Sequence, residues 1–229
     1  ERPEAKSLDP APQSAIVAQG RAGVASALAR ARARIVTAKI TQVLVAATDS
    51  LLSWPTLNHY EKQDRLLTGS NSNGFMAGEG AGALLLGYPQ GSGGEVVVAG
   101  IGFGREAAHL ESGEPLRADG LSQAIKAALL DSDCQMHDMD FRVTDNSGEQ
   151  YYFKEAALAL SRTLRQRKEE FDIWHPSECT GEAGAAIGVT VIANAYSACK
   201  KGYTKGPNVL AHWANDSGQR AALALQHRV

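Results

Sequence analysis

Hydrophobic residues along the chain fall into short apolar runs separated by amphipathic stretches. The runs at residues 42–47, 83–86 and 95–103 are bounded by polar or glycine-rich segments, which predicts buried strands. Shorter strands are expected at 14–17, 141–143, 208–211 and 221–225, and residues 173–174 are a brief apolar stretch. Apolar or small residues recur at helical spacing in residues 23–35, 120–130, 153–167 and 184–199, which predicts helices. This alternation predicts an α/β protein with a layered sheet.

Two strand pairings follow from the order of these elements. A strand at 14–17, a helix at 23–35 and a strand at 42–47 predict a right-handed crossover between parallel strands. The glycine-rich turn at 91–94 predicts that the strands on either side of it form a hairpin. Residues 1–13 are polar and proline-rich, so a linker or loop is expected before one domain spanning residues 14–229.

The composition excludes several classes of function. The chain has 229 residues, 44% of them hydrophobic, and a net charge of −2, as expected of a soluble globular protein. The alternating Ala and Arg of residues 29–34 are typical of a solvated helix face, so no nucleic-acid partner is expected. No run of eighteen apolar residues occurs, so no membrane span is expected. The chain has neither an initiator Met nor a signal peptide at its start, which suggests that a longer polypeptide precedes it.

Cysteine and histidine spacing gives no sign of a metal or a disulfide framework. Cys134, Cys179 and Cys199 are odd in number and widely separated, which favours a reducing, cytoplasmic location. The six histidines lack the spacing of metal ligands, so no metal and no cofactor is expected.

A glycine-rich segment, G-F-M-A-G-E-G-A-G-A-L-L-L, occupies residues 74–86. Its glycines at 78, 80 and 82 could be read as a dinucleotide-binding fingerprint. A phosphate-binding loop must open a helix, however, and this segment leads into an apolar strand. The glycines are therefore expected to let a loop pass close to other backbone before it enters the sheet.

The same segment resembles a characteristic motif of the β-ketoacyl synthases of the thiolase superfamily. Residues 14–47 resemble that family's nucleophile strand, nucleophile helix and following strand. T-G-E-A-G-A-A at 180–186 resembles its T-G-H-x-x-G-A-A motif, one residue shorter, and S-G-Q-R-A-A-L at 217–223 resembles its closing G-G-T-N-A-A-L strand. The resemblance implies a thiolase-like α-β-α-β-α fold, with the family's first hundred or more residues outside this sequence.

The family's chemistry requires residues that this chain lacks at the matching positions. A synthase of this kind uses a Cys at a helix N-terminus to accept the acyl group, and two His, or His and Asn, to decarboxylate malonyl thioester. By the resemblance, Gln19 stands at the Cys position, although a shift of two residues would place Arg21 there. Asp145 and Glu182 stand at the two His positions. An amide cannot carry an acyl group, and a carboxylate would raise the energy of a developing enolate.

The resemblance therefore implies a non-condensing pseudo-enzyme that acts as a partner or scaffold subunit in fatty-acid or polyketide-type metabolism. Its expected partners are an acyl carrier protein or a synthase-like chain, in a homo- or heterodimer. Two alternatives stay open. One is an active 3-oxoacyl-(acyl-carrier-protein) synthase-type acyltransferase that uses Cys179, with His175 as its base. The other is a malonyl-thioester decarboxylase that uses Gln19.

Overall fold

The strands form two separate sheets in the part of the chain that the computed structural model describes, residues 14–91 and 93–228. The first sheet pairs β1 (Gln42–Ser50) with β2 (Glu79–Gly87) antiparallel. The second has the order β3-β7-β6-β4-β5 and comprises β3 (Glu95–Arg105), β4 (Phe141–Thr144), β5 (Ile173–Trp174), β6 (Asn208–Ala214) and β7 (Gln219–Arg228). The helices are η1 (Gly20–Ala22), α1 (Gly23–Ala38), α2 (Trp54–Lys62), α3 (Asp119–Asp131), η2 (Met136–Asp138), α4 (Gln150–Thr163), α5 (Ser177–Thr180) and α6 (Ala186–Lys201).

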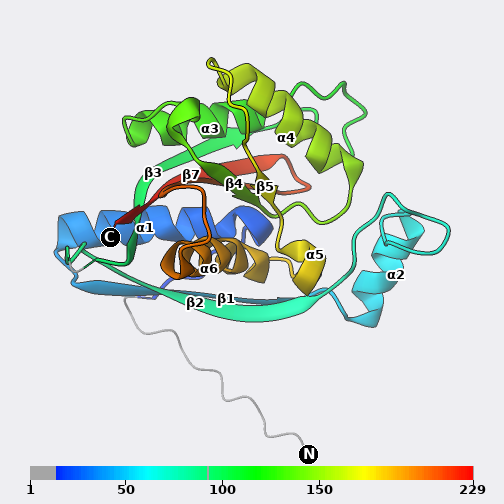
Figure 1. The fold of residues 1–229 in the computed structure, drawn as a ribbon. Coiled ribbons are helices and arrows are strands. Elements are labelled where there is room, and N and C mark those ends of the chain that lie inside the picture. Colours follow the sequence, from blue (N-terminus) through cyan, green and yellow to red (C-terminus); the bar gives the residue numbers. More distant parts are fainter. Residues whose placement is uncertain (1–13, 92, 229) are drawn as a thin grey trace, which may run out of the picture.

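These elements stack in layers (Figure 1). Helices α1 and α6 lie between the two sheets, and α3 and α4 cover the far face of the five-stranded sheet. The predicted α/β class and layered architecture are therefore confirmed. Helix α2 projects from one end of the two-stranded sheet.

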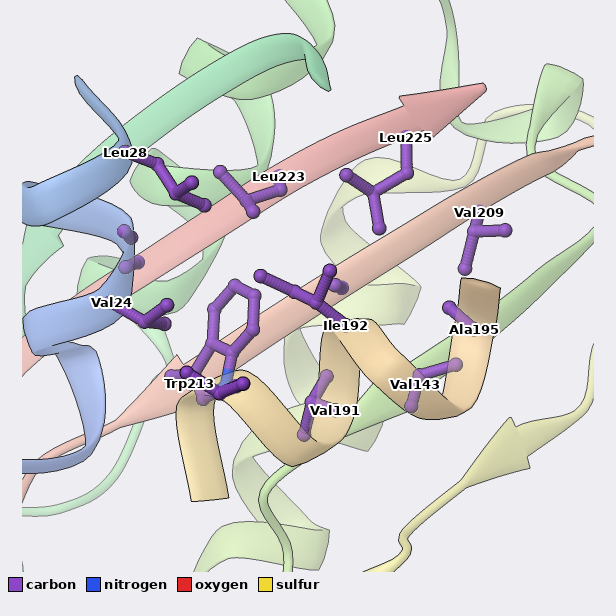
Figure 2. Close-up of a cluster of buried hydrophobic side chains, with 14 of the residues drawn as sticks. Val24, Leu28, Val143, Val191, Ile192, Ala195, Val209, Trp213, Leu223 and Leu225 are labelled. Carbon is purple, nitrogen blue, oxygen red and sulfur yellow. The ribbon is translucent and has the colours of Figure 1, made fainter. Parts of the chain in front are cut away.

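The main hydrophobic core fills the space between α1, α6 and the five-stranded sheet. Figure 2 shows Val24 and Leu28 of α1 and Ile192 of α6 gathered around Trp213 of β6 and Leu223 of β7. Trp213 and Leu223 are completely buried. Burial of this much apolar side-chain surface holds the middle layer against the sheet.

Helix α3 rests directly on the backbone of β3. A Cβ added at Gly102 would come within 2.0 Å of the carbonyl oxygen of Ala124, and one at Gly100 within 2.0 Å of that of Ala128. Only glycine permits such an approach. This close contact with α3 holds β3 in the five-stranded sheet, where it pairs antiparallel with β7.

The predicted hairpin of residues 83–86 with 95–103 is therefore wrong. Strand β2 pairs with β1 in the other sheet, and its Gly82 packs against Val189 of α6, whose Cγ1 would lie 2.8 Å from an added Cβ. The two strands are adjacent in sequence, but they pack against different helices. The chain crosses from one sheet to the other between them.

The predicted strand at 14–17 is also wrong, and with it the parallel pair. Residues 14–18 form no strand, and β1 pairs antiparallel with β2 in the register Leu44–Leu85. The helix predicted at 153–167 is shifted and runs from Gln150 to Thr163. The linker expected at 1–13 lies outside the described residues. Among the described helices, none is both long and apolar enough to cross a membrane.

Candidate functional site: a buried network of arginines and carboxylates

The N-terminus of helix α1 begins with the turn Gln19-Gly20-Arg21, which Asn215 fixes in place. The Asn215 amide donates to the Gln19 carbonyl at 2.6 Å and accepts from the Ala22 N–H at 3.3 Å. Gly20 has φ of +50°, in the left-handed region that favours glycine. The start of α1 is therefore tied to the loop between β6 and β7.

Arg21 projects from this turn into the interior and is only 8% exposed. Its Nη1 lies 3.2 Å from Oε2 of Glu182, and its Nε lies 3.7 Å from Oδ2 of Asp145. Its Nη2 donates to Asp216 at 2.7 Å. The guanidinium carbon also lies 4.6 Å from the centre of the Tyr152 ring. One arginine thus joins the two carboxylates that the sequence resemblance predicts at the histidine positions.

A second arginine extends this arrangement. Arg65 donates to both carboxylate oxygens of Glu149, at 2.7 and 2.9 Å, and to Asp216 at 2.8 Å. Such bidentate pairs are among the strongest hydrogen bonds in proteins. Asp216, which also accepts from the Tyr152 hydroxyl, bridges the two arginines. We call the set of Arg21, Arg65, Asp145, Glu149, Glu182 and Asp216 the arginine–carboxylate network.

The network contains four carboxylates and two guanidinium groups. Burial raises the pKa of Glu182 to about 7 against the opposing effect of Arg21, and the nearby Asp145 carboxylate raises it further. Burial likewise raises the pKa of Asp145. Burial would also raise the pKa of Asp216, but Arg21 and Arg65 hold it well below its usual range. Asp216 is therefore ionised at neutral pH, whereas burial favours the protonated forms of Glu182 and Asp145.

The glycine-rich segment positions Glu182. The Glu182 N–H donates to the Met76 carbonyl at 2.7 Å, and its carbonyl accepts from the Gly78 N–H at 2.9 Å. A Cβ added at Gly78 would come within 2.6 Å of the Thr180 carbonyl oxygen. The expected close passage of this loop beside other backbone is therefore confirmed.

Asp145 is positioned by the five-stranded sheet. It follows the last residue of β4 and accepts from the Ala214 N–H, at the end of β6, at 3.0 Å. The hydroxyl of Thr144 donates to the other carboxylate oxygen at 3.3 Å. Asp145 is 1% exposed, so its contacts with Arg21 and these donors replace water.

A cavity of about 420 Å³ lies beside the network. Gln19, Arg21 and Glu182 line it, together with Arg65, Glu149 and Asp216. The structure thus brings Gln19 and Glu182 to one cavity, whereas Asp145 contacts Arg21 but is not among the residues that line the cavity. Its other lining residues are Ala18, Gly20, Asp49, Leu51, Tyr60, Phe75, Gly184, Asn215, Ser217 and Gln219.

Cys179 and His175 lie outside this arrangement. Cys179 is exposed on the short helix α5, and neither residue is among those that line the cavity. His175 Nδ1 lies 3.0 Å from Glu178 Oε1, an ion-pair distance without hydrogen-bond geometry, and its ring packs edge-on against Phe153. The structure therefore gives Cys179 no place among the residues that surround Arg21.

The sequence interpretation missed Arg65, Glu149, Tyr152 and Asp216. Arg65 and Glu149 are single charged residues outside any motif, and Tyr152 stands in the aromatic run Y-Y-F at 151–153, which is typical of packing or partner contact. Asp216 alone carries a weak signal, because it directly precedes the S-G-Q-R-A-A-L segment. Among the described residues, no three His, Cys, Asp or Glu side chains are grouped so that they could hold a metal ion.

No protein-family model matches the sequence, and no curated protein is significantly similar to it. Solved structures are similar. A structure of a ketosynthase in complex with its chain length factor from Xenorhabdus doucetiae matches with a TM-score of 0.78 and 15% identity, over 91% of this chain and 58% of that chain. A type II polyketide synthase ketosynthase in complex with its acyl-carrier protein matches with a TM-score of 0.79 and 17% identity, over 92% and 62%. A β-ketoacyl synthase from Burkholderia phymatum matches with a TM-score of 0.75 and 17% identity, over 93% and 61%.

The chain therefore has the thiolase-like fold of the β-ketoacyl synthases. It spans between 58% and 62% of the length of these three synthase chains. At these identities the likeness establishes the fold, and the activity has to be argued from the site.

Proposed function

We propose that this chain is a non-condensing member of the synthase fold that serves as a partner subunit in acyl-thioester metabolism. The observation that carries the proposal is the position of Arg21. Its guanidinium lies between Asp145 and Glu182 and contacts both. Condensation requires hydrogen-bond donors aimed at the oxygen of a developing enolate. Carboxylates at these two positions are acceptors, and the Arg21 donors are engaged by these two carboxylates and by that of Asp216.

The residue at the predicted nucleophile position supports the same conclusion. Gln19 precedes η1 and α1 at the place where a thiolate would gain from the helix dipole, but its amide is not a nucleophile for a thioester. The free cysteines lie elsewhere: Cys199 is buried, and burial raises the pKa of its thiol. Cys179 is exposed on α5.

A partner role is supported by two of the similar solved structures, in which the ketosynthase is bound to another protein. One matched ketosynthase was solved with its chain length factor and another with its acyl-carrier protein. We therefore propose a synthase-like chain or an acyl carrier protein as the partner, in a homo- or heterodimer in the cytoplasm. The pathway is of the fatty-acid or polyketide type.

Intact-mass spectrometry tests the loss of activity. The protein is incubated with acetyl- and malonyl-loaded acyl carrier protein, and its mass is compared with that of Cys179→Ala. No covalent adduct is expected in either protein. An acyl adduct that disappears in Cys179→Ala would establish the alternative acyltransferase and overturn the proposal.

Decarboxylation is a second candidate because Gln19 lines the cavity. It predicts release of carbon dioxide from malonyl-loaded carrier protein without condensation. Gln19→Ala would abolish that release, whereas Gln219→Ala, which removes another amide from the cavity wall, would leave it unchanged. Equal, background-level release from all three proteins would exclude decarboxylation at this site.

A further inference from the structure

The Asp216 carboxylate is held by donors from separate segments of the chain. Its Oδ1 accepts from Nη2 of Arg21 at 2.7 Å and from the Tyr152 hydroxyl, and its Oδ2 accepts from Nη1 of Arg65 at 2.8 Å. Arg21 belongs to η1, Arg65 follows α2 and Tyr152 belongs to α4. Guanidinium groups and a hydroxyl that converge in this way suit a single carboxylate. We call these three donor groups the anion cradle.

The same arginines reach the other carboxylates of the network with different nitrogen atoms. Nη1 of Arg21 donates to Glu182, and Nε and Nη2 of Arg65 donate to Glu149. Each arginine side chain is only 10% exposed, so a donor left without an acceptor would be costly. Asp216 supplies the acceptor that the cradle needs. An anionic ligand in the cavity would therefore have to compete with Asp216 for the same donors.

The backbone keeps Asp216 in the cradle. It lies in the tight turn between β6 and β7, where the Asn215 N–H donates to the Gln219 carbonyl at 2.9 Å and the Gly218 N–H donates to the Asn215 carbonyl at 3.1 Å. The Asn215 side chain is bound in turn to the start of α1. Because Asp216 is also ionised at neutral pH, the cradle holds a negative charge that belongs to the chain itself.

We propose that Asp216 is an internal anion that determines the ligand specificity of the cavity, because it occupies the anion cradle and so excludes ligands with a free carboxylate, such as a malonyl group. With Asp216 in place, carboxylates of the chain already offset the charges of Arg21 and Arg65. A further carboxylate would have to leave water without gaining a cation. Uncharged acyl groups escape this exclusion. The inference rests on the proposed function only in taking the cavity as the place of the acyl group.

Isothermal titration calorimetry at fixed ionic strength tests this assignment, with malonate as the probe. Asp216→Ala empties the cradle and should bind malonate at least about tenfold more tightly than the unmodified chain, the change that one hydrogen bond to a charged group brings. Malonamide, which has the same skeleton without the charges, should gain no affinity. Asp49→Asn is the matched control, because it removes a negative charge from the same cavity wall and its amide can still accept from the Ala185 N–H. It should bind malonate no more tightly than the unmodified chain.

Circular dichroism checks that Asp216→Ala is folded. If it is not, Asp216→Asn, which keeps the size of the side chain and removes its charge, is titrated instead and should also gain affinity for malonate. Three results would overturn the proposal: no gain in the folded variant, an equal gain in Asp49→Asn, or an equal gain for malonamide. Calorimetry follows ligand binding and condensation assays follow acyl transfer, so this proposal and the proposed function can fail separately.

Discussion

The Arg21 guanidinium lies 3.2 Å from the Glu182 carboxylate in the interior of the protein, where each side chain is at most 10% exposed. The sequence resemblance predicts Glu182 at a histidine position of the synthase motifs and Gln19, two residues before Arg21, at the cysteine position. The ion pair between Arg21 and Glu182 engages N–H donors of Arg21 that could otherwise stabilise negative charge on a substrate. A buried ion pair of this kind constrains the structure whether or not it increases net stability.

Removing Arg21 leaves Asp145 and Glu182 without their shared cation. We expect Arg21→Met to lower the free energy of unfolding by about 3–5 kcal/mol, the usual cost of an uncompensated buried charge. Urea unfolding measures the change. Arg32→Met, on the adjoining helix α1, is the control, because its pair with Asp131 is exposed and should be worth about 0–1 kcal/mol. Equal effects of the two substitutions would contradict a special role for Arg21.

Glu182 gives stability a pH dependence. Its pKa rises from 4.5 to about 7 on folding, so the folded protein holds more protons than the unfolded chain between these values. This contribution is fully present below pH 4.5 and is lost as the pH rises toward 7. For one group the slope is at most about 1.4 kcal/mol per pH unit.

Unfolding at pH 5 and pH 7.5 in the unmodified protein and in Glu182→Gln measures this effect. The substitution should flatten the fall in stability between the two pH values. Glu178→Gln serves as the control, because the Glu178 side chain is 67% exposed. An unchanged pH dependence in Glu182→Gln would show that this carboxyl does not titrate in the window.

Because α3 lies against the backbone of β3, adding a single methyl group at the contact should lower the stability of the protein. Gly102→Ala would place its Cβ 2.0 Å from the Ala124 carbonyl oxygen and should destabilise the protein by about 1–3 kcal/mol or more, through forced displacement of the helix. Gly69→Ala is the control, because nothing lies within 4 Å of that Cβ. Thermal unfolding of both variants provides the comparison. A melting temperature for Gly102→Ala that matches the Gly69→Ala value would refute the close approach.

Local periodicity predicted the strands and helices well, because each apolar run or amphipathic stretch depends only on nearby residues. It failed to predict which strands pair, because strand pairing depends on packing against helices that are distant in the sequence. Strands β2 and β3 read as a hairpin, yet Gly82 packs on α6 and Gly102 on α3. Nothing local to the turn between them encodes that separation.

The residues of the candidate site also fall into two groups, those that the sequence pointed to and those that it did not. The resemblance drew attention to Gln19, Asp145 and Glu182 because they lie in segments that resemble the family's motifs, whereas Asp216 and Arg65 belong to no motif. A lone charged residue reads in sequence as a solvated one, and only the fold shows that Asp216 bridges two buried arginines.

A condensation assay tests the central claim most directly. Acyl-loaded and malonyl-loaded carrier proteins are mixed with the purified chain, and both carbon dioxide release and β-ketoacyl product are followed against a reaction without the protein. A non-condensing site predicts that no β-ketoacyl product forms above that background. Product that depends on the unmodified chain and disappears in Cys179→Ala or Gln19→Ala would contradict it.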